Sequence, residues 1–137
     1  MSSVTCVDVG SNQLHERIKY HPKITFFENT DIRNFQSKEI FEIVTCDVSF
    51  ISILNILNDI NRLAPKDIII LFKPQFEVGT NVKRDKKGVV KDKNAILKAR
   101  QKFVDSTLAL NWNLKYSSLS KLQGKDGNEE ELFYFSK

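Results

Sequence analysis

A chain of 137 residues, 41% of them hydrophobic, is long enough to bury one core and too short for two domains of ordinary size. Apolar runs such as Ile68 to Phe72 fall far below the roughly 18 residues of a membrane-spanning helix, and the first residues lack the basic and apolar regions of a secretory signal, so we expect a cytoplasmic protein without membrane contact. The net charge of +4 is unevenly distributed, because segment 83–102 carries nine Lys or Arg against two Asp.

Strands and helices alternate through the first half of the chain. The β-branched run Val4–Val9 predicts a strand, and Leu14 and Ile18, four residues apart, predict a short helix before the next strand in "KITFFEN". The apolar run Ile43–Cys46 predicts a strand covered on both faces. A helix in "SILNILNDINRLAP" follows and is ended by Pro65, and "DIIILF" is the next strand. This order is typical of an α/β domain with a parallel sheet.

The second half begins with a long polar loop, "VGTNVKRDKKGVVKDKN", of the kind that is usually functional or mobile. Asp92 is the expected N-cap of a helix. Helical spacing directs one set of side chains inward, Ile96, Ala99, Phe103 and Leu108, and leaves another for the solvent, Lys93, Lys98, Arg100 and Lys102. Two β runs joined by a Gly-containing turn predict a final hairpin.

Two cysteines, Cys6 and Cys46, lie inside apolar segments and have neither a CxxC partner nor the spacing of zinc ligands. We expect buried free thiols and no metal site. A disulfide stays open from sequence, although a cytoplasmic setting disfavours one.

Polar residues at the ends of the predicted strands are the candidates for chemistry, because ligands of open α/β sheets bind outside the carboxyl ends of the strands. They are Asp8, the segment 28–31, Asp47 and Lys73. Asp8 and Asp47 could instead cap the helices that follow them. Lys73 could extend to the surface along its aliphatic stem, but it sits between a buried strand and Pro74, on stiff backbone.

Several motifs together resemble one family. "CDVSFIS", "LFKPQFE" and "GKDGNEEE" occur in this order, with "VDVGSNQL", "ENTDIR" and "KKGVVKD" around them. They resemble the TlyA-type hemolysins, which belong to the FtsJ-like ribosomal RNA 2′-O-methyltransferases, and the resemblance covers nearly the whole chain. It implies a Rossmann-like, mostly parallel sheet with a C-terminal antiparallel hairpin. It also implies S-adenosylmethionine as cofactor and ribosomal RNA or ribosomal subunits as partner.

The resemblance implies a catalytic set of Asp47 from "DVSFIS", Lys73 from "KPQFE" and Glu130 from "GN-x-E". Glu129 and Glu131 flank Glu130, and on a strand they would point away from the site. A lysine held neutral, or placed to stabilise the forming alkoxide, would help a ribose hydroxyl to attack the sulfonium methyl group. The two carboxylates would orient this lysine.

The resemblance also implies the cofactor contacts: Asp8 near the ribose, Asp31 near the adenine, and Asp47. Phe76 could pack in the core or stack on the substrate. The basic segment 83–102 fits contact with an RNA backbone, through Lys83, Arg84, Lys86, Lys87 and Lys91.

Three functions compete. The first is methylation of ribosomal RNA. The second is a non-enzymatic RNA-binding module that uses the basic segment, although a run of charges is also typical of a solvated helix face. Pore formation, the literal meaning of hemolysin, ranks last, because no segment is apolar enough to span a membrane.

The sequence departs from the family pattern at its start. It contains no "GxSxGG", no counterpart of the first catalytic lysine and no S4-type RNA-binding domain. We therefore expect residues 1–137 to be a partial FtsJ-like methyltransferase domain without its first strand and Gly-rich loop, and we expect weak cofactor binding. The gap would be closed by pairing of the strands before Asp8 and Asp47, or by another chain in an oligomer.

Overall fold

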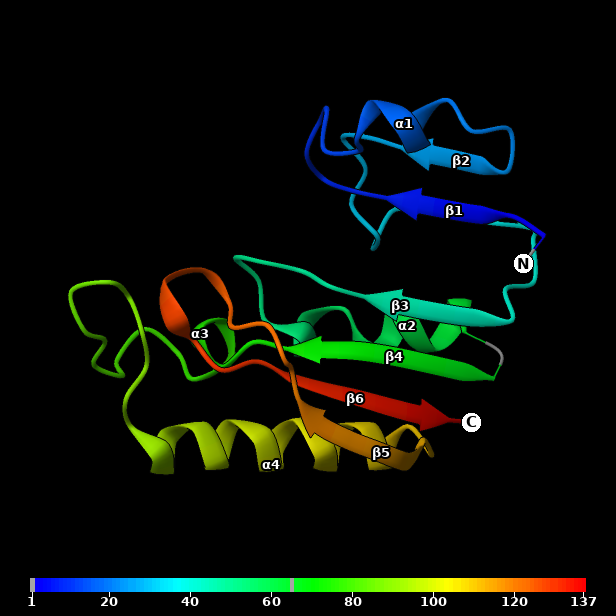
Figure 1. The fold of residues 1–137 in the computed structure, drawn as a ribbon. Coiled ribbons are helices and arrows are strands. Elements are labelled where there is room, and N and C mark those ends of the chain that lie inside the picture. The colour runs from blue at the N-terminus through cyan, green and yellow to red at the C-terminus, as the bar shows by residue number, and fades with distance from the viewer. Residues whose placement is uncertain (1, 65) are drawn as a thin grey trace. The chain divides into compact units, whose positions relative to one another are not determined.

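The computed structural model describes residues 2–64 and 66–137, so the predicted helix stop at Pro65 lies outside the described residues. The chain divides into two compact units, residues 1–38 and 39–137 (Figure 1). In chain order the elements are β1 (Val4–Val7), α1 (Glu16–Lys19), β2 (Ile24–Phe27), β3 (Ile43–Cys46), η1 (Ile53–Asn55), α2 (Leu57–Leu63), β4 (Asp67–Phe72), α3 (Pro74–Glu77), α4 (Lys93–Ala109), β5 (Asn113–Leu119), η2 (Lys125–Gly127) and β6 (Glu131–Ser136).

The first unit contains a parallel pair of strands, β1 and β2, with Val4 opposite Ile24 and Val7 opposite Phe27. Strand β1 is shorter than predicted. It ends at Val7 because the next residue, Asp8, starts a turn in which its carboxylate accepts the Gly10 N–H at 2.8 Å.

The second unit contains a four-stranded sheet in the order β3-β4-β6-β5. Strands β3 and β4 are parallel, and β6 is antiparallel to both of its neighbours. The mixed α/β fold and the final hairpin are therefore as predicted. Strand β1 pairs with β2 and β3 with β4, so the direct pairing of the strands before Asp8 and Asp47 is not found among the described residues.

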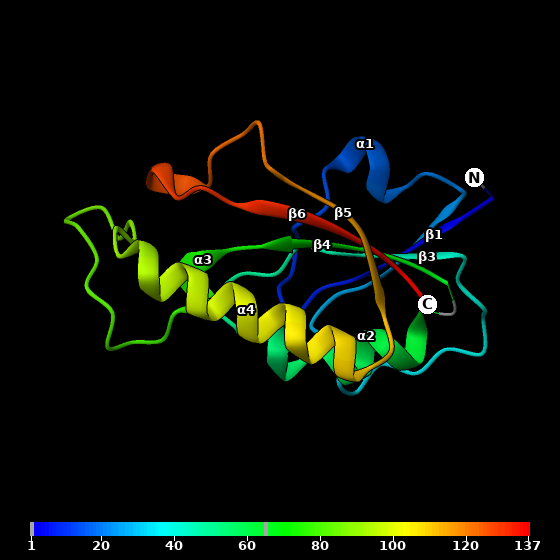
Figure 2. The same ribbon diagram turned by 90° about the horizontal axis from the view of Figure 1, so that it is seen from below.

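The core of the second unit lies between this sheet and its helices. Alternate side chains of β4 are buried, as expected for a strand with one face on the core. Helices α2 and α4 run along the same face of the sheet (Figure 2). Phe103 of α4 is fully buried, and its ring lies 5.4 Å from that of Phe72 and 5.0 Å from that of Phe133. This aromatic cluster fixes the strands whose ends carry the predicted catalytic residues.

Helix α4 begins as predicted, because Asp92 accepts the Ala95 N–H at 3.0 Å. The prediction for its last inward position is wrong. Thr107 is buried at 2% exposure, whereas Leu108 is 66% exposed. A step of four residues from Phe103 leads to position 107, so the following leucine turns toward solvent.

Arg100 was expected on the solvent side of α4, and this prediction is also wrong. Its guanidinium donates to both carboxylate oxygens of Glu131, at 2.8 and 2.9 Å, and lies 5.1 Å from the ring centre of Phe133. The arginine therefore joins α4 to the start of β6.

Candidate functional site

Lys73 projects from the carboxyl end of β4. The strand ends at Phe72, and Pro74 begins α3, so the lysine occupies the single extended residue between them. Its Nζ lies 2.6 Å from Asp47 Oδ1 and donates to Ser49 Oγ at 3.1 Å. The lysine side chain is only 13% exposed, compared with 66% for Asp47. It therefore does not simply extend to the surface.

The ladder geometry explains why Lys73 and Asp47 meet. Strands β3 and β4 are parallel, with Cys46 opposite Ile70, so the residues that follow both strands emerge at the same edge. Asp47 does not cap a helix, because the N-cap of η1 is Ser52. Two of the three predicted catalytic residues are thus in direct contact.

Glu130 emerges at the same end of the sheet, because β6 is antiparallel to β4 with Glu131 opposite Phe72. Its side chain is buried, with the residue 8% exposed. A side chain on Gly124 would overlap the Glu130 carboxylate, which would have to move away from its present position. Within the described residues, Glu130 forms no ion pair with Lys73.

Gln75 binds Glu130 and was not singled out from the sequence. Its Nε2 donates to Glu130 Oε1 at 3.1 Å. An ionised carboxylate only accepts hydrogen bonds, so the amide nitrogen must face it. The other amide atom, Gln75 Oε1, is consequently buried without a hydrogen-bond partner among the described residues. A buried polar atom without a partner costs about 1–3 kcal/mol.

Glu77, also missed from the sequence, fastens α3 to the loop after β3. Its carboxylate accepts the Ser52 hydroxyl at 2.7 Å and the Ile53 N–H at 2.8 Å. Burial raises the pKa of Glu77, and these two hydrogen bonds oppose the rise. The glutamate therefore fixes the loop that carries Asp47 against the turn that carries Lys73.

An exposed aromatic side chain lies in the same loop. Phe50 is 91% exposed and adopts a positive φ of 65°, which is rare for a residue with a side chain. Its ring centre lies 5.1 Å from that of Phe76. Phe76 is half-buried in this contact and is not part of the core. The expectation that Phe76 packs in the core is therefore wrong.

The two predicted cofactor residues of the first unit, Asp8 and Asp31, lie in the loops after β1 and β2, which are joined by a Thr30 N–H to Asp8 carbonyl bond of 2.9 Å. Asp8 does not cap α1, whose N-cap is His15, and its Oδ2 has no partner among the described residues. Asp31 is bound to Arg33, with Nη2 and Oδ2 2.6 Å apart, and these hydrogen bonds lower the pKa of Asp31 to about 2.

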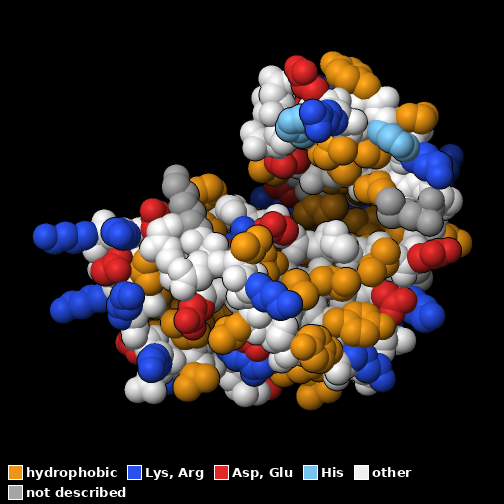
Figure 3. Space-filling view, viewed as in Figure 1, with side chains coloured by type: hydrophobic (Ala, Val, Ile, Leu, Met, Phe, Trp, Pro, Cys, Tyr) orange, Lys and Arg blue, Asp and Glu red, His pale blue; other side chains and the backbone are white. Residues whose placement is uncertain are grey.

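The cations predicted to contact RNA fall into two kinds. All five residues are exposed, but the Arg84 guanidinium is bound to backbone carbonyl oxygens and, within the described part of the chain, the lysines at 83, 86, 87 and 91 are not. In Figure 3, Lys and Arg side chains project from the side where the loop between α3 and α4 lies in Figure 1.

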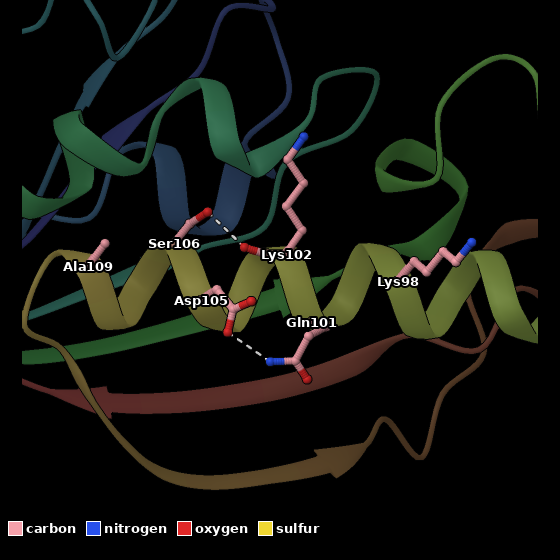
Figure 4. A pocket seen from close by; sticks show the side chains of 6 residues that line it. All are labelled: Lys98, Gln101, Lys102, Asp105, Ser106 and Ala109. Carbon is pink, nitrogen blue, oxygen red and sulfur yellow. Dashed lines mark hydrogen bonds between the residues drawn. The ribbon is translucent and has the colours of Figure 1, made fainter.

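A shallow pocket on the outer surface of α4 holds none of the predicted site residues (Figure 4). It is lined by Lys98, Gln101, Lys102, Asp105, Ser106 and Ala109. Its polar groups bond within the helix, with Gln101 Nε2 2.8 Å from Asp105 Oδ1 and Ser106 Oγ 2.7 Å from the Lys102 carbonyl oxygen. These contacts are typical of a solvated helix face.

Within residues 2–64 and 66–137, no helix is long and apolar enough to cross a membrane, and no group of three or more His, Cys, Asp or Glu is placed to hold a metal ion. Cys6 and Cys46 are free thiols, as predicted, but both residues are half-buried, whereas fully buried thiols were expected. Burial raises the pKa of Cys46 to about 12.

Comparisons with known proteins identify relatives of this chain. The "23S rRNA (cytidine-2'-O)-methyltransferase TlyA" of Campylobacter jejuni is 55% identical over 134 residues, which are 98% of this chain and 53% of that protein. The "16S/23S rRNA (cytidine-2'-O)-methyltransferase TlyA" of Mycobacterium tuberculosis is 34% identical over 138 residues, covering 96% of this chain and 50% of that protein. The chain thus spans about half the length of the curated relatives it matches.

Among solved structures, a Lactococcus lactis protein called a "putative hemolysin" superposes with a TM-score of 0.90 at 28% identity, covering 99% of this chain and 67% of that one. The family model for FtsJ-like methyltransferases matches residues 1–137. The motifs, the strand-end geometry and this match over the full sequence lead to one conclusion: the chain belongs to the FtsJ-like methyltransferase family.

Proposed function

We propose that this domain transfers a methyl group from S-adenosylmethionine to a ribose 2′-hydroxyl of ribosomal RNA. The observation that carries the proposal is the contact of Lys73 Nζ with Asp47 Oδ1 at 2.6 Å, at the carboxyl ends of two parallel strands. The printed names of the relatives from C. jejuni and M. tuberculosis support ribosomal RNA as the substrate. Such a substrate would place the protein in the cytoplasm.

Lys73 is the residue that would act on the ribose oxygen. The Lys73 ammonium, 2.6 Å from Asp47 Oδ1, would donate to the developing alkoxide, and the proton of the ribose hydroxyl would pass to bulk water. Asp47 and Ser49 would hold the ammonium in place, since both contact it. Glu130, kept in position by Gln75, would supply the second carboxylate at this edge of the sheet.

When bound, S-adenosylmethionine supplies the electrophilic methyl group. In the first unit Asp8 fits a cofactor ribose, because it has a carboxylate oxygen without a partner and lies in an exposed loop. Asp31 fits less well, since Arg33 occupies both of its oxygens. Asp47 is the cofactor candidate of the second unit. Isothermal titration should show weak binding, further reduced in Asp8→Ala; micromolar affinity would contradict our expectation for residues 1–137.

The RNA would meet the exposed lysines at 83, 86, 87 and 91, which can neutralise phosphates, and the ring of Phe50, which can stack on a base. Phe50 is suited to this because it is 91% exposed in the loop that carries Asp47.

Tritium transfer from labelled S-adenosylmethionine to ribosomal subunits, at a cofactor concentration above the dissociation constant from the titration, tests the catalytic proposal. Lys73→Ala should lower the rate by a factor of roughly 10²–10³, the usual cost of removing one donor to a developing oxyanion. Lys66→Ala is the matched control, because that lysine is exposed just before the other end of the same strand. Measurable transfer that is equal in the wild type and Lys73→Ala would refute the role of Lys73.

A second candidate function is RNA binding without catalysis, favoured by the exposed lysines of the loop after α3. It predicts salt-sensitive RNA binding that Lys73→Ala leaves unchanged, together with no methyl transfer by the wild type. The same experiment therefore separates the two candidates.

Association of chains belongs to this proposal as well. Strand β3 is hydrogen-bonded to β4 alone among the described strands, so its other edge is open to a strand from another chain. Light scattering coupled to gel filtration tests this: a dimer would support it, and a monomer at all concentrations would contradict it.

A further inference from the structure

Residues 84–90 of the basic loop form an ordered hairpin. Arg84 and Val90 form an antiparallel bridge, and the Asp85 N–H donates to the Val89 carbonyl at 3.0 Å. The Asp85 carboxylate accepts the N–H groups of Lys87 and Val89, at 2.8 and 2.9 Å, which closes the turn from inside. The loop was expected to lack regular structure, but this part of it holds its shape through its own hydrogen bonds.

Arg84 fastens the hairpin to α3. One guanidinium nitrogen, Nη2, donates to the carbonyl oxygens of Gln75 and Gly79 at 2.9 and 3.1 Å. The other, Nη1, donates to the Val82 carbonyl at 2.8 Å. A planar guanidinium can reach three acceptors in this way, whereas a lysine ammonium is a point donor on a flexible stem. Arg84 is therefore engaged by the protein itself.

Asn128 fastens the other strand of the hairpin to the turn before β6. Its Oδ1 accepts the Val90 N–H at 3.1 Å, and the residue is only 5% exposed. Val89 and Val90 are buried at 6% exposure, so the hairpin also rests on apolar contacts. Asn128 lies two residues before Glu130, which is bound in turn to Gln75. The hairpin is thus fixed to both segments that frame the candidate site.

We propose that hairpin 84–90 is a preformed arm for the phosphodiester backbone of RNA, in which Lys86 and Lys87 contact phosphates while Arg84 is the scaffold of the arm. The choice of RNA as partner rests on the proposed function. Lys86 and Lys87 are exposed at the turn, whereas Lys91, 4.0 Å from Asp85, follows the hairpin and is not part of it. An arm that is ordered before binding loses less conformational entropy when it meets its partner.

Arg84→Lys tests the scaffold, because it keeps the charge and the trypsin site but loses the bridge between three carbonyls. Trypsin should cleave after Lys86 or Lys87 about tenfold faster in this variant than in the wild type, through local opening of the hairpin. Lys83→Arg is the matched control, with charge and cleavage site retained next to the hairpin, and should leave the rate unchanged. Circular dichroism checks that the remaining fold is intact. Equal cleavage of Arg84→Lys and the wild type would overturn the scaffold role.

Binding of a fluorescent single-stranded RNA at several salt concentrations tests the contact. Replacing both Lys86 and Lys87 by Ala should lower the slope of log K against log salt by about 1.4, since each phosphate contact contributes about 0.7. Arg84→Lys should weaken binding several-fold despite its unchanged charge. An unchanged slope for the double variant, or no binding by the wild type, would overturn the arm. Neither measurement uses the cofactor, so a failure of the methyl-transfer proposal would not change the results expected from cleavage and RNA binding.

Discussion

Glu77 holds the loop that carries Asp47 against the turn that follows Lys73, and its replacement should loosen the candidate site. Glu77→Leu leaves the Ser52 hydroxyl and the Ile53 N–H, now 2.7 and 2.8 Å from the carboxylate, without their acceptor. Each buried donor that loses its partner costs about 1–3 kcal/mol, and the site is partly exposed. We therefore expect a loss of about 2–4 kcal/mol in the free energy of unfolding, a large part of the usual total.

Glu77→Gln should be milder, at about 1 kcal/mol or less, because it keeps one acceptor and removes a charge that burial disfavours. The pH dependence has a definite sign. Burial raises the folded-state pKa of Glu77 above its ordinary value of 4.5, so the folded protein binds the proton more tightly than the unfolded chain. The wild type should gain stability relative to Glu77→Gln below pH 4.5 and lose this gain as pH rises through the folded-state pKa.

Urea denaturation followed by circular dichroism at pH 7 and pH 4 measures both effects. The comparison requires that the slope of the free energy of unfolding against urea concentration is the same for all variants. Glu129→Gln is the matched control, because that carboxylate is exposed and should change stability by less than about 0.5 kcal/mol. An unfolding midpoint for Glu77→Leu equal to that of the wild type would refute the reasoning. So would a stability advantage of the wild type over Glu77→Gln that is larger at pH 7 than at pH 4.

Three further predictions concern the second unit. At pH 8 Cys46 should react with iodoacetamide far more slowly than free cysteine does. Burial raises the pKa of Cys46 to about 12, which leaves roughly one thiol in ten thousand ionised. Mass spectrometry measures the labelling, and labelling as fast as that of free cysteine would contradict the prediction. Phe103→Ala should cost about 3–5 kcal/mol in urea denaturation, whereas Leu108→Ala, at a 66% exposed position, should cost less than about 0.5; similar losses would count against the aromatic core. Arg100→Lys should lower stability by about 0.5–1 kcal/mol, since a lysine cannot donate to both oxygens of Glu131, and an unchanged melting temperature would argue that this pair contributes nothing.

Hydrophobic periodicity was sufficient to predict the elements that bury one face. The run "DIIILF" becomes β4 with the predicted bounds, and Asp92 caps α4 as predicted, because both signals are local. The contact of Lys73 with Asp47 follows from the parallel register of two predicted strands and was within reach of the sequence. Leu108 was misplaced because several apolar residues at helical spacing leave the end of the buried stripe ambiguous by one position.

The remaining contacts could not be predicted, because they join segments whose relative geometry the sequence does not encode locally. Arg84 looked like any other cation of a basic run, and only the folded loop brings three carbonyl oxygens within reach of its guanidinium. Gln75 and Glu130 are 55 positions apart, and their hydrogen bond depends on β6 inserting between β4 and β5. A polar residue in a short motif offers no sign of which distant partner it will meet.

The segment "KPQFE" shows why a site of this kind can be built on so few residues. Strand β4 delivers Lys73 at its end, and the single turn α3 then rotates the following side chains by about 100° per residue, so that they point in different directions. Lys73 reaches the loop after β3, Gln75 reaches the turn before β6, and Glu77 returns to the loop after β3 from the other side. An extended strand would have sent alternate residues to only two faces. The helical turn, which was not predicted from the sequence, is therefore what allows one segment to hold both neighbouring loops around the lysine.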